Sequence, residues 1–197
     1  NSGQQVSVIA RGANLAAIKA RGLRLVRIDD SEEIAHVTAY ANCTDAGPHD
    51  AVFLAVKANQ IAAVAPTIGA LFGADTPVVT MQNGLPWWYF QRFDGAHAGY
   101  RLRTADADGV IAANIDAQRI LGCVVYPAGE LTAPGVIKHV EGDRLPIGEL
   151  DCSDSQRARQ LAEVLVGSGF KSPVLADIRS EIWLKLRTGG NFRCLRY

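Results

Sequence analysis

The chain has 197 residues, of which 48% are hydrophobic, enough apolar material for one moderate domain or for one domain and part of another. Lys and Arg number 20, and Asp and Glu also number 20, so the formal net charge is zero. The sequence has no basic block typical of nucleic-acid binding, no apolar run near the roughly 20 residues of a membrane-spanning helix, and no secretory signal. We therefore expect a cytoplasmic protein that binds neither nucleic acids nor membranes.

The four cysteines stand far apart, with no Cys-x-x-Cys pair and no histidine close by. This spacing favours neither a metal site nor a disulfide framework. Reduced thiols, the usual state in a cytoplasm, are the expectation.

The N-terminal part of the chain predicts a strand, a helix and a second strand. Residues 5–11 are rich in Val and Ile, as in a short buried strand. Residues 13–22 have helical spacing that ends at Gly22, a residue type that often terminates helices. In residues 23–28 apolar and polar side chains alternate, which is typical of a strand at a sheet edge.

The next segments predict two strands that flank a helix. The apolar run at residues 50–58 has the pattern of a parallel strand that is buried on both faces. Residues 59–73 are helical in pattern, with Pro66 as a kink or break. Residues 76–85 predict another buried strand, which ends in an Asn-Gly turn signal.

The C-terminal half predicts a strand at residues 119–131 and a hairpin at residues 135–150 that turns near Glu-Gly-Asp-Arg. Residues 155–169 form a clear amphipathic pattern that ends at a glycine, which predicts a helix. A last strand is expected at residues 170–177, and a new helix begins near Ile178.

Alternating apolar strands and helices predict an α/β fold with a doubly wound, mostly parallel sheet. Ligands bind such sheets at the carboxyl ends of the strands. Arg11, Lys57 and Asn83 each follow a predicted strand, so we expect these three polar side chains at one edge of the sheet, as a binding site. The alternative is that each is a solvated loop residue, and that Asn83 belongs simply to a turn.

These segments, in this order and spacing, resemble the ketopantoate reductase (2-dehydropantoate 2-reductase) family. The resemblance covers about residues 5–186 and rests on VSVIARGANLAAIKARGL, DAVFLAVKANQ, VVTMQNGLPWW, GCVVYPAGEL with PGVIKHVEGD, and DIRSEIWLKL. Family members reduce a small-molecule 2-oxo acid with NADPH on the route to pantothenate. They join a Rossmann domain to a helical domain and bind substrate between the two. The resemblance therefore implies a Rossmann-like NADP-binding domain at residues 1–177, the start of the helical domain at residues 178–197, and a homodimer as a candidate assembly.

The resemblance also implies roles for individual residues. It assigns cofactor binding to Arg11, Lys57, Asn83 and Ala128. In such folds NAD sites usually carry an acidic residue near the adenosine ribose, whereas an arginine suits a 2′-phosphate, so Arg11 favours NADP(H) over NAD(H). Lys185 resembles the catalytic lysine of the family, and Lys185 and Asn83 are the expected substrate contacts.

The expected chemistry explains why a lysine is needed. A hydride delivered to the carbonyl carbon of a 2-oxo acid produces an alkoxide, which requires a cation and then a proton. A partly desolvated ammonium supplies both. Without the resemblance, the favoured interpretation of Lys185 is a side chain that extends from an amphipathic helix into water.

The start of the sequence departs from the family pattern. Family members open with a strand and a Gly-x-Gly-x-x-Gly turn that binds pyrophosphate at a helix N-terminus, and this sequence contains no such motif. We expect a fragment whose sheet lacks its first, central strand. Such a fragment would have a reduced affinity for dinucleotides and two exposed strand edges.

The end of the sequence departs as well. The family helix carries asparagines four and eight residues after the lysine, where this chain has Gly189 and Arg193. Asn191 falls on the far side of a helix drawn through these positions. We expect the helical domain to be truncated and the residues after about Leu186 to differ from the ancestral sequence.

Other polar and aromatic features predict packing. The aromatic cluster at residues 87–90 is expected to form a cleft wall or core contacts, and His139 is expected to be structural. Glu130 and Glu149 have no partner that the sequence suggests.

Two alternatives to a ketopantoate reductase stay open at this point. One is an inactive nucleotide-binding or interaction remnant of the family, which predicts weak NADPH binding and association through unpaired strand edges. The other is a related NADP-dependent reductase of another 2-oxo acid, because one fold hosts several substrates.

Overall fold

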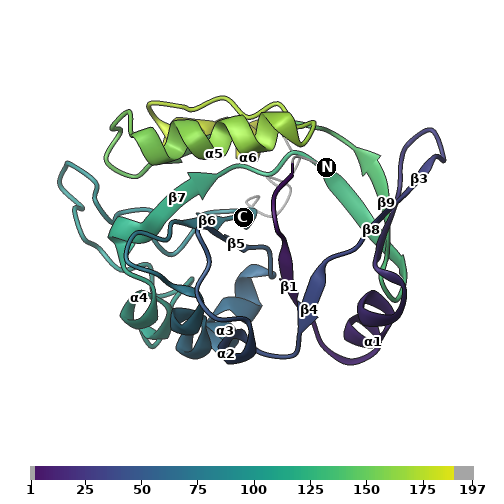
Figure 1. The fold of residues 1–197 in the computed structure, drawn as a ribbon. Helices are drawn as coiled ribbons and strands as arrows, with labels where there is room; N and C mark the ends of the chain where they lie inside the picture. Colours follow the sequence, from purple (N-terminus) through teal and green to yellow (C-terminus); the bar gives the residue numbers. More distant parts are fainter. Residues whose placement is uncertain (1–2, 189–197) are drawn as a thin grey trace, which may run out of the picture.

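The computed structural model describes residues 3–188, which form three hydrogen-bonded sheets with helices packed around them (Figure 1). The central sheet has the strand order β10-β7-β6-β5. Its strands are β5 (Val52–Leu54), β6 (Val78–Thr80), β7 (Ile120–Cys123) and β10 (Ile147–Glu149). Strands β5, β6 and β7 run parallel, and β10 pairs antiparallel with β7.

Six α-helices lie within the described residues, together with three short 3-10 turns. The helices are α1 (Gly12–Arg21), α2 (Cys43–Ala46), α3 (Ile61–Ile68), α4 (Val110–Asn114), α5 (Gln156–Gly167) and α6 (Ile178–Thr188), and the turns are η1 (Ala58–Gln60), η2 (Gly69–Leu71) and η3 (Ala117–Arg119). The expected end of α1 is confirmed, because Gly22 follows it with a φ of 78°, a value that favours glycine. Pro66 lies inside α3, and the predicted helix 59–73 is divided into η1, α3 and η2.

Alternate residues of the central sheet face two separate cores. Val78 and Ile120 belong to a core that includes residues of α3, α4 and α6. Val79 and Leu121 belong to a second core, which is closed by α5. Figure 1 shows α5 on one side of the sheet and α3 and α4 on the other. Helices on both faces explain why these strands are apolar without alternation, and they confirm the predicted doubly wound α/β fold.

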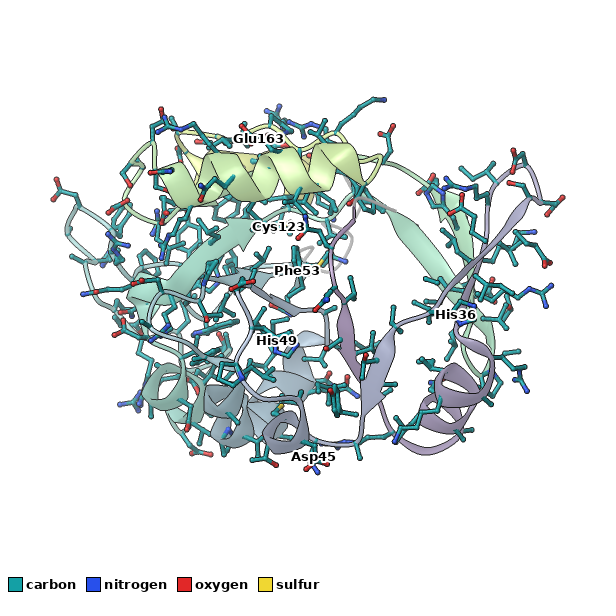
Figure 2. The ribbon with its side chains drawn as sticks, in the orientation of Figure 1. His36, Asp45, His49, Phe53, Cys123 and Glu163 are labelled. Carbon is teal, nitrogen blue, oxygen red and sulfur yellow. The ribbon has the colours of Figure 1, made fainter. Side chains whose placement is uncertain are left out.

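Strand β5 is less buried than its sequence predicts. Val52 and Leu54 are buried, but Phe53 is 41% exposed. The prediction of a strand buried on both faces is wrong because β5 is the edge strand of its sheet. The core beneath α5 is built on residues of β6, β7 and β10, so it does not reach the Phe53 face. Figure 2 labels Phe53 below Cys123, which lies under α5.

Two further sheets flank the central one. The first consists of β1 (Ser7–Ile9) and β4 (Thr38–Tyr40), which pair in parallel, and the second contains β2 (Leu23–Val26), β3 (Glu32–Ala35), β8 (Ala128–Ala133) and β9 (Val136–Glu141) in the order β3-β2-β9-β8. The prediction that residues 23–28 form an edge strand is wrong. Strand β2 lies between β3 and β9. Alternation of side chains reflects which face of a sheet is buried and not whether a strand lies at its edge.

The hairpin forms one element earlier than the sequence predicts. The expected strand 119–131 is divided into β7 and β8, and Pro127, which cannot donate to a ladder, lies between them. β8 and β9 then form the hairpin, with a turn in which Gly135 has a φ of 75°. The predicted hairpin 135–150 is therefore wrong, because β10 leaves β9 and pairs with β7 in the central sheet.

The predicted strand 170–177 is also wrong. Within this segment only isolated bridges form, from Lys171 to Arg144 and from Val174 to Ile147. Pro173 lies between the two bridges and has no N–H group, so a continuous ladder is interrupted there. The helix expected from Ile178 is confirmed as α6.

The aromatic cluster packs as predicted. Trp88 is 1% exposed, and its indole Nε1 donates to Thr80 Oγ1 at 3.0 Å. No helix in residues 3–188 is long and apolar enough to cross a membrane. The predictions about Gly189, Asn191 and Arg193 lie outside the described residues.

Candidate functional site

Lys185 on α6 meets the carboxyl ends of two parallel strands. Its Nζ donates to Asn83 Oδ1 at 2.5 Å, although the two residues are 102 positions apart in the sequence. It also donates to the carbonyl oxygen of Val125, which follows β7. Asn83 follows β6, the neighbour of β7 in the central sheet. The structure therefore brings together the two residues from which the sequence predicts substrate contacts.

The start of α6 is fixed by its own N-terminal residues. Asp177 Oδ1 accepts hydrogen bonds from the backbone N–H groups of Arg179 at 3.0 Å and Ser180 at 3.2 Å, so it caps two of the unpaired donors of the helix. The Ser180 hydroxyl donates to Asp177 Oδ2 at 2.5 Å, and this bond is the largest reason why the pKa of Asp177 lies below its usual value.

Arg179 joins α6 to the loop that follows β6. The side chain is buried, and its guanidinium donates to three main-chain carbonyls, at 2.7 Å to Tyr89, 2.8 Å to Gln91 and 2.5 Å to Leu150. Burial lowers the pKa of Arg179 from its ordinary value, against the attraction of nearby acidic groups. The contacts fix the direction in which α6 leaves the central sheet.

Two glycines let α6 approach the sheet closely. A Cβ on Gly122 of β7 would lie 2.9 Å from the Trp88 ring and 3.0 Å from the Ile178 side chain. A Cβ on Gly148 of β10 would lie 2.5 Å from the carbonyl oxygen of Leu175. Only glycine leaves room at these positions, so the sheet itself sets the distance between α6 and the strand ends.

The surroundings of Lys185 shift two pKa values. Burial lowers the pKa of Lys185, and the nearby Cys123 thiol opposes this effect. Burial raises the pKa of Cys123 to about 12, in spite of the Lys185 ammonium. The thiol is therefore neutral at physiological pH, and the lysine gives up its proton more readily than a solvated one does.

Gln82 connects the exits of β5 and β6, and its role is not evident from the sequence. Its Nε2 donates to the carbonyls of Leu54 at 2.5 Å and Val56 at 3.0 Å. Its Oε1 is buried and accepts no hydrogen bond from the described part of the chain. Gln82 therefore holds the loop before Lys57 beside the loop that carries Asn83.

The other predicted site residues are placed differently. Arg11 follows β1 and occupies the N-cap position of α1, where its exposed side chain makes no capping bond. Lys57 follows β5 and is also exposed. Ala128 is the first residue of β8 and pairs with Glu141. No hydrogen bond or ion pair within residues 3–188 joins Arg11, Lys57 or Ala128 to Asn83 or Lys185.

Of the three side chains expected at one edge of the sheet, two follow strands of the central sheet and one does not. Lys57 and Asn83 follow the neighbouring parallel strands β5 and β6. Arg11 follows β1, which belongs to the separate sheet with β4. The prediction that all three side chains share one hydrogen-bonded sheet is wrong for Arg11, because no strand of the described chain pairs β1 with β5.

Residues that sequence reasoning missed surround Lys185. Tyr126, Arg144 and Glu181 form a connected group beside it, and Glu181 lies one helical turn before the lysine on α6. The spacing of four residues between Glu181 and Lys185 is the signal that could have placed the acid on the same helix face. Glu149, for which the sequence suggests no partner, accepts from Ser155 and Arg157.

Two surface hollows of about 470 Å³ each lie away from Lys185 and Asn83. One is lined by α4 and η3, and the other lies between Tyr89, Asp151 and the start of α6. The chemistry that the sequence predicts is concentrated at the strand ends instead. In the part of the chain that the structure describes, no three His, Cys, Asp or Glu side chains are grouped in a way that could hold a metal ion.

A parallel sheet with helices on both faces, and polar side chains at the ends of its strands, defines a Rossmann-like α/β protein. A family model described as "Ketopantoate reductase PanE/ApbA" matches residues 1–87. A 2-dehydropantoate 2-reductase of Mesorhizobium japonicum is 49% identical over 181 residues, which are 92% of this chain and 55% of the relative.

Solved structures with a similar fold point to the same family. A Ralstonia solanacearum chain assigned to the ketopantoate reductases has a TM-score of 0.89 and 37% identity, over 94% of this chain and 57% of the other. A 2-dehydropantoate 2-reductase from Geobacter metallireducens has a TM-score of 0.76 and 25% identity, over 94% and 55%. Over most of its length the chain is similar to members of the ketopantoate reductase family. It spans about 55% of the length of the Mesorhizobium relative.

Proposed function

We propose that the protein reduces a 2-oxo acid with NADPH, with 2-dehydropantoate as the substrate and pantoate as the product, as a step of pantothenate biosynthesis. The observation that carries this proposal is the contact of Lys185 with Asn83 at the carboxyl ends of the parallel strands. The 49% identity to a protein named 2-dehydropantoate 2-reductase supports the choice of substrate.

Lys185 is the proposed catalytic residue. Reduction of the substrate carbonyl places negative charge on its oxygen, and an ammonium at that position stabilises the charge and then donates a proton. The lowered pKa of Lys185 suits a proton donor that works near neutral pH. Asn83 Oδ1 accepts from the ammonium, which leaves the Asn83 amide N–H group as a donor for the substrate.

The side chains at the strand ends fit the phosphorylated nicotinamide cofactor NADPH. The cofactor supplies the hydride for the reduction. Arg11, exposed after β1, is the proposed partner of the 2′-phosphate, because a guanidinium forms paired hydrogen bonds with phosphate oxygens. The proposed role of Lys57 and Asn83 is to contact the cofactor closer to its reactive end. Ala128, at the start of β8, is proposed to border the cofactor through its backbone.

Domain organisation and assembly belong to the same proposal. Residues 1–177 form the cofactor-binding domain, and residues 178–197 begin the substrate and dimerisation domain. Association of two copies is supported by exposed apolar side chains on edge strands, namely Ile9 of β1 and Phe53 of β5. Buried free thiols at Cys43 and Cys123 are compatible with the proposed cytoplasmic location.

Calorimetric titration of the chain with NADPH and with NADH tests the cofactor part of this proposal. We expect tighter binding of NADPH than of NADH, and an Arg11→Ala variant that loses this preference by about tenfold or more. Arg21→Ala is the matched control, because Arg21 is exposed at the other end of the same helix. No binding of either nucleotide would favour an inactive remnant of the family.

The choice of substrate is the second arm of the test. NADPH consumption with 2-dehydropantoate is compared with consumption with other 2-oxo acids. A faster reaction with another 2-oxo acid would identify a related reductase instead.

A further inference from the structure

Two cations contact the ring of Tyr126. The Lys185 Nζ is 5.3 Å from the centre of the Tyr126 ring, and the Arg144 Cζ is 5.2 Å from it. Both distances lie within the range in which a cation is attracted to an aromatic face. Val125, whose carbonyl accepts from Lys185, is the residue directly before Tyr126. One short segment after β7 therefore holds the ammonium through both its backbone and its next side chain.

The Tyr126 hydroxyl is itself anchored. It donates to Glu181 Oε1 at 2.8 Å, and Arg144 pairs with the same carboxylate oxygen. Glu181 is only 8% exposed, so its charge is compensated by Arg144 rather than by water. The ring is thus fixed by an acid on α6 and by an arginine before β10, two elements that are far apart in the sequence.

Protonation states agree with this arrangement. Burial would raise the pKa of Glu181, but the hydrogen bonds from Arg144 and Tyr126 outweigh burial and lower it. Burial and the bond to Glu181 raise the pKa of Tyr126, so its hydroxyl stays a donor. The Glu181 bond raises the pKa of Arg144. At neutral pH the group consists of a carboxylate, a phenol and a guanidinium.

We propose that Tyr126, anchored by Glu181 and Arg144, is a positioning residue that holds the Lys185 ammonium against Asn83 and the Val125 carbonyl. The ring shields one side of the ammonium from water, and its face attracts the charge. The contact does not depend on the reaction. Its consequence for catalysis rests on the proposed function, because only there does the position of Lys185 matter.

Cys123 on β7 and Tyr126 after it are titratable groups that interact with Lys185 in the described chain. Glu181 on the same helix and Arg144 before β10 reach it through Tyr126, which contacts both. The ring has two opposite effects, since shielding favours the neutral amine and the aromatic face favours the ammonium. A leucine side chain keeps much of the shielding but has no aromatic face, so we expect replacement of Tyr126 by Leu to lower the Lys185 pKa further.

The test is competitive acetylation of the folded chain across a pH series, with the labelling of each lysine read by mass spectrometry. Only the neutral amine reacts, so the midpoint of labelling reports the pKa of each lysine. Two short lysine peptides, labelled in the same solution, serve as standards. In the wild-type chain the Lys185 midpoint is expected below those of the standards.

Two variants separate the ring from its hydroxyl. Tyr126→Leu is expected to lower the Lys185 midpoint further below the standards, and Tyr126→Phe, which keeps the ring but loses the Glu181 bond, is expected to lower it by less. Tyr100→Leu is the matched control, because Tyr100 is exposed and packs against Phe90 instead. We expect this variant to leave the Lys185 midpoint unchanged.

An unchanged Lys185 midpoint in Tyr126→Leu would overturn the proposal. If circular dichroism shows that Tyr126→Leu does not fold, Tyr126→Phe decides, and a midpoint equal to that of the wild type overturns the proposal. The labelling needs no substrate or cofactor. A chain that shows the predicted midpoints but no reductase activity would keep this inference and reject the proposed function.

Discussion

The Lys185 cluster (Asn83, Tyr126, Glu181 and Lys185) and Arg11 represent two kinds of site. The cluster is assembled by hydrogen bonds and ring contacts from three parts of the chain. Arg11 stands exposed after β1, on a sheet that does not pair with the central one in the described residues. A preassembled cluster and a single exposed cation respond to mutation differently, because only the cluster contributes to the stability of the fold.

Arg179→Met is expected to have the largest effect on stability. The change leaves three main-chain carbonyls without their donor, one buried and two part-buried, and we expect a loss of about 3 kcal/mol in the free energy of unfolding. Urea unfolding measures the loss. Arg187→Met, at an exposed position of the same helix, is the control and should change stability little. Equal stability of the two variants would show that Arg179 does not hold α6 in place.

Gly122→Ala tests the close approach of α6 to β7. The added methyl group would overlap the Trp88 ring and the Ile178 side chain, so we expect about 2 kcal/mol of destabilisation. Gly69→Ala is matched to it, because a Cβ at Gly69 meets no atom within 4 Å and Gly69 is not among the positive-φ glycines. A wild-type unfolding midpoint in Gly122→Ala would contradict the packing described for α6.

Glu181→Gln tests the electrostatic part of the Lys185 cluster. Loss of the charged hydrogen-bond acceptor is expected to lower the free energy of unfolding by about 1.5 kcal/mol at neutral pH. Because the folded pKa of Glu181 lies below 4.5, its contribution is complete above about pH 4.5 and is lost as the pH falls through the folded pKa. The variant should therefore lose less stability than the wild type in acid.

The acid titration has its own control. Glu163 is exposed on the outer side of α5 (Figure 2), and Glu163→Gln should leave the acid limb of the stability curve unchanged. If both variants follow the wild-type curve in acid, the Glu181 carboxylate does not contribute as described.

Arg11→Ala should have the smallest effect on stability. Its side chain is exposed and forms no capping bond, so we expect a change below about 0.5 kcal/mol in the free energy of unfolding. Thermal unfolding without ligand measures this change. A large loss of stability would mean that Arg11 is a structural residue, and that its loss of NADPH affinity could not be assigned to a phosphate contact.

The sequence predicts the alternation of strands and helices because these elements depend on local periodicity and on residues such as Gly22. It fails where pairing across the chain decides the outcome. Residues 23–28 alternate like an edge strand, but β9 pairs with them. The turn at Gly135 places the hairpin before the one expected near Glu-Gly-Asp-Arg.

The same distinction applies to the site. The resemblance to a family singles out Lys185 and Asn83, and the structure brings them into contact. Tyr126 and Arg144 could not be found in this way, because their roles depend on contacts with Glu181 across 55 and 37 residues. Periodicity and spacing carry no information about such contacts.

The most direct test of the central claim compares NADPH consumption by the wild type and by Lys185→Met with 2-dehydropantoate as substrate. We expect the wild type to consume one NADPH for each substrate molecule reduced. Lys185→Met should be about 10²- to 10⁴-fold slower in kcat, with NADPH binding unchanged, because general acid catalysis accounts for that range. A Lys185→Met variant that reduces the substrate at the wild-type rate would contradict the role assigned to this lysine.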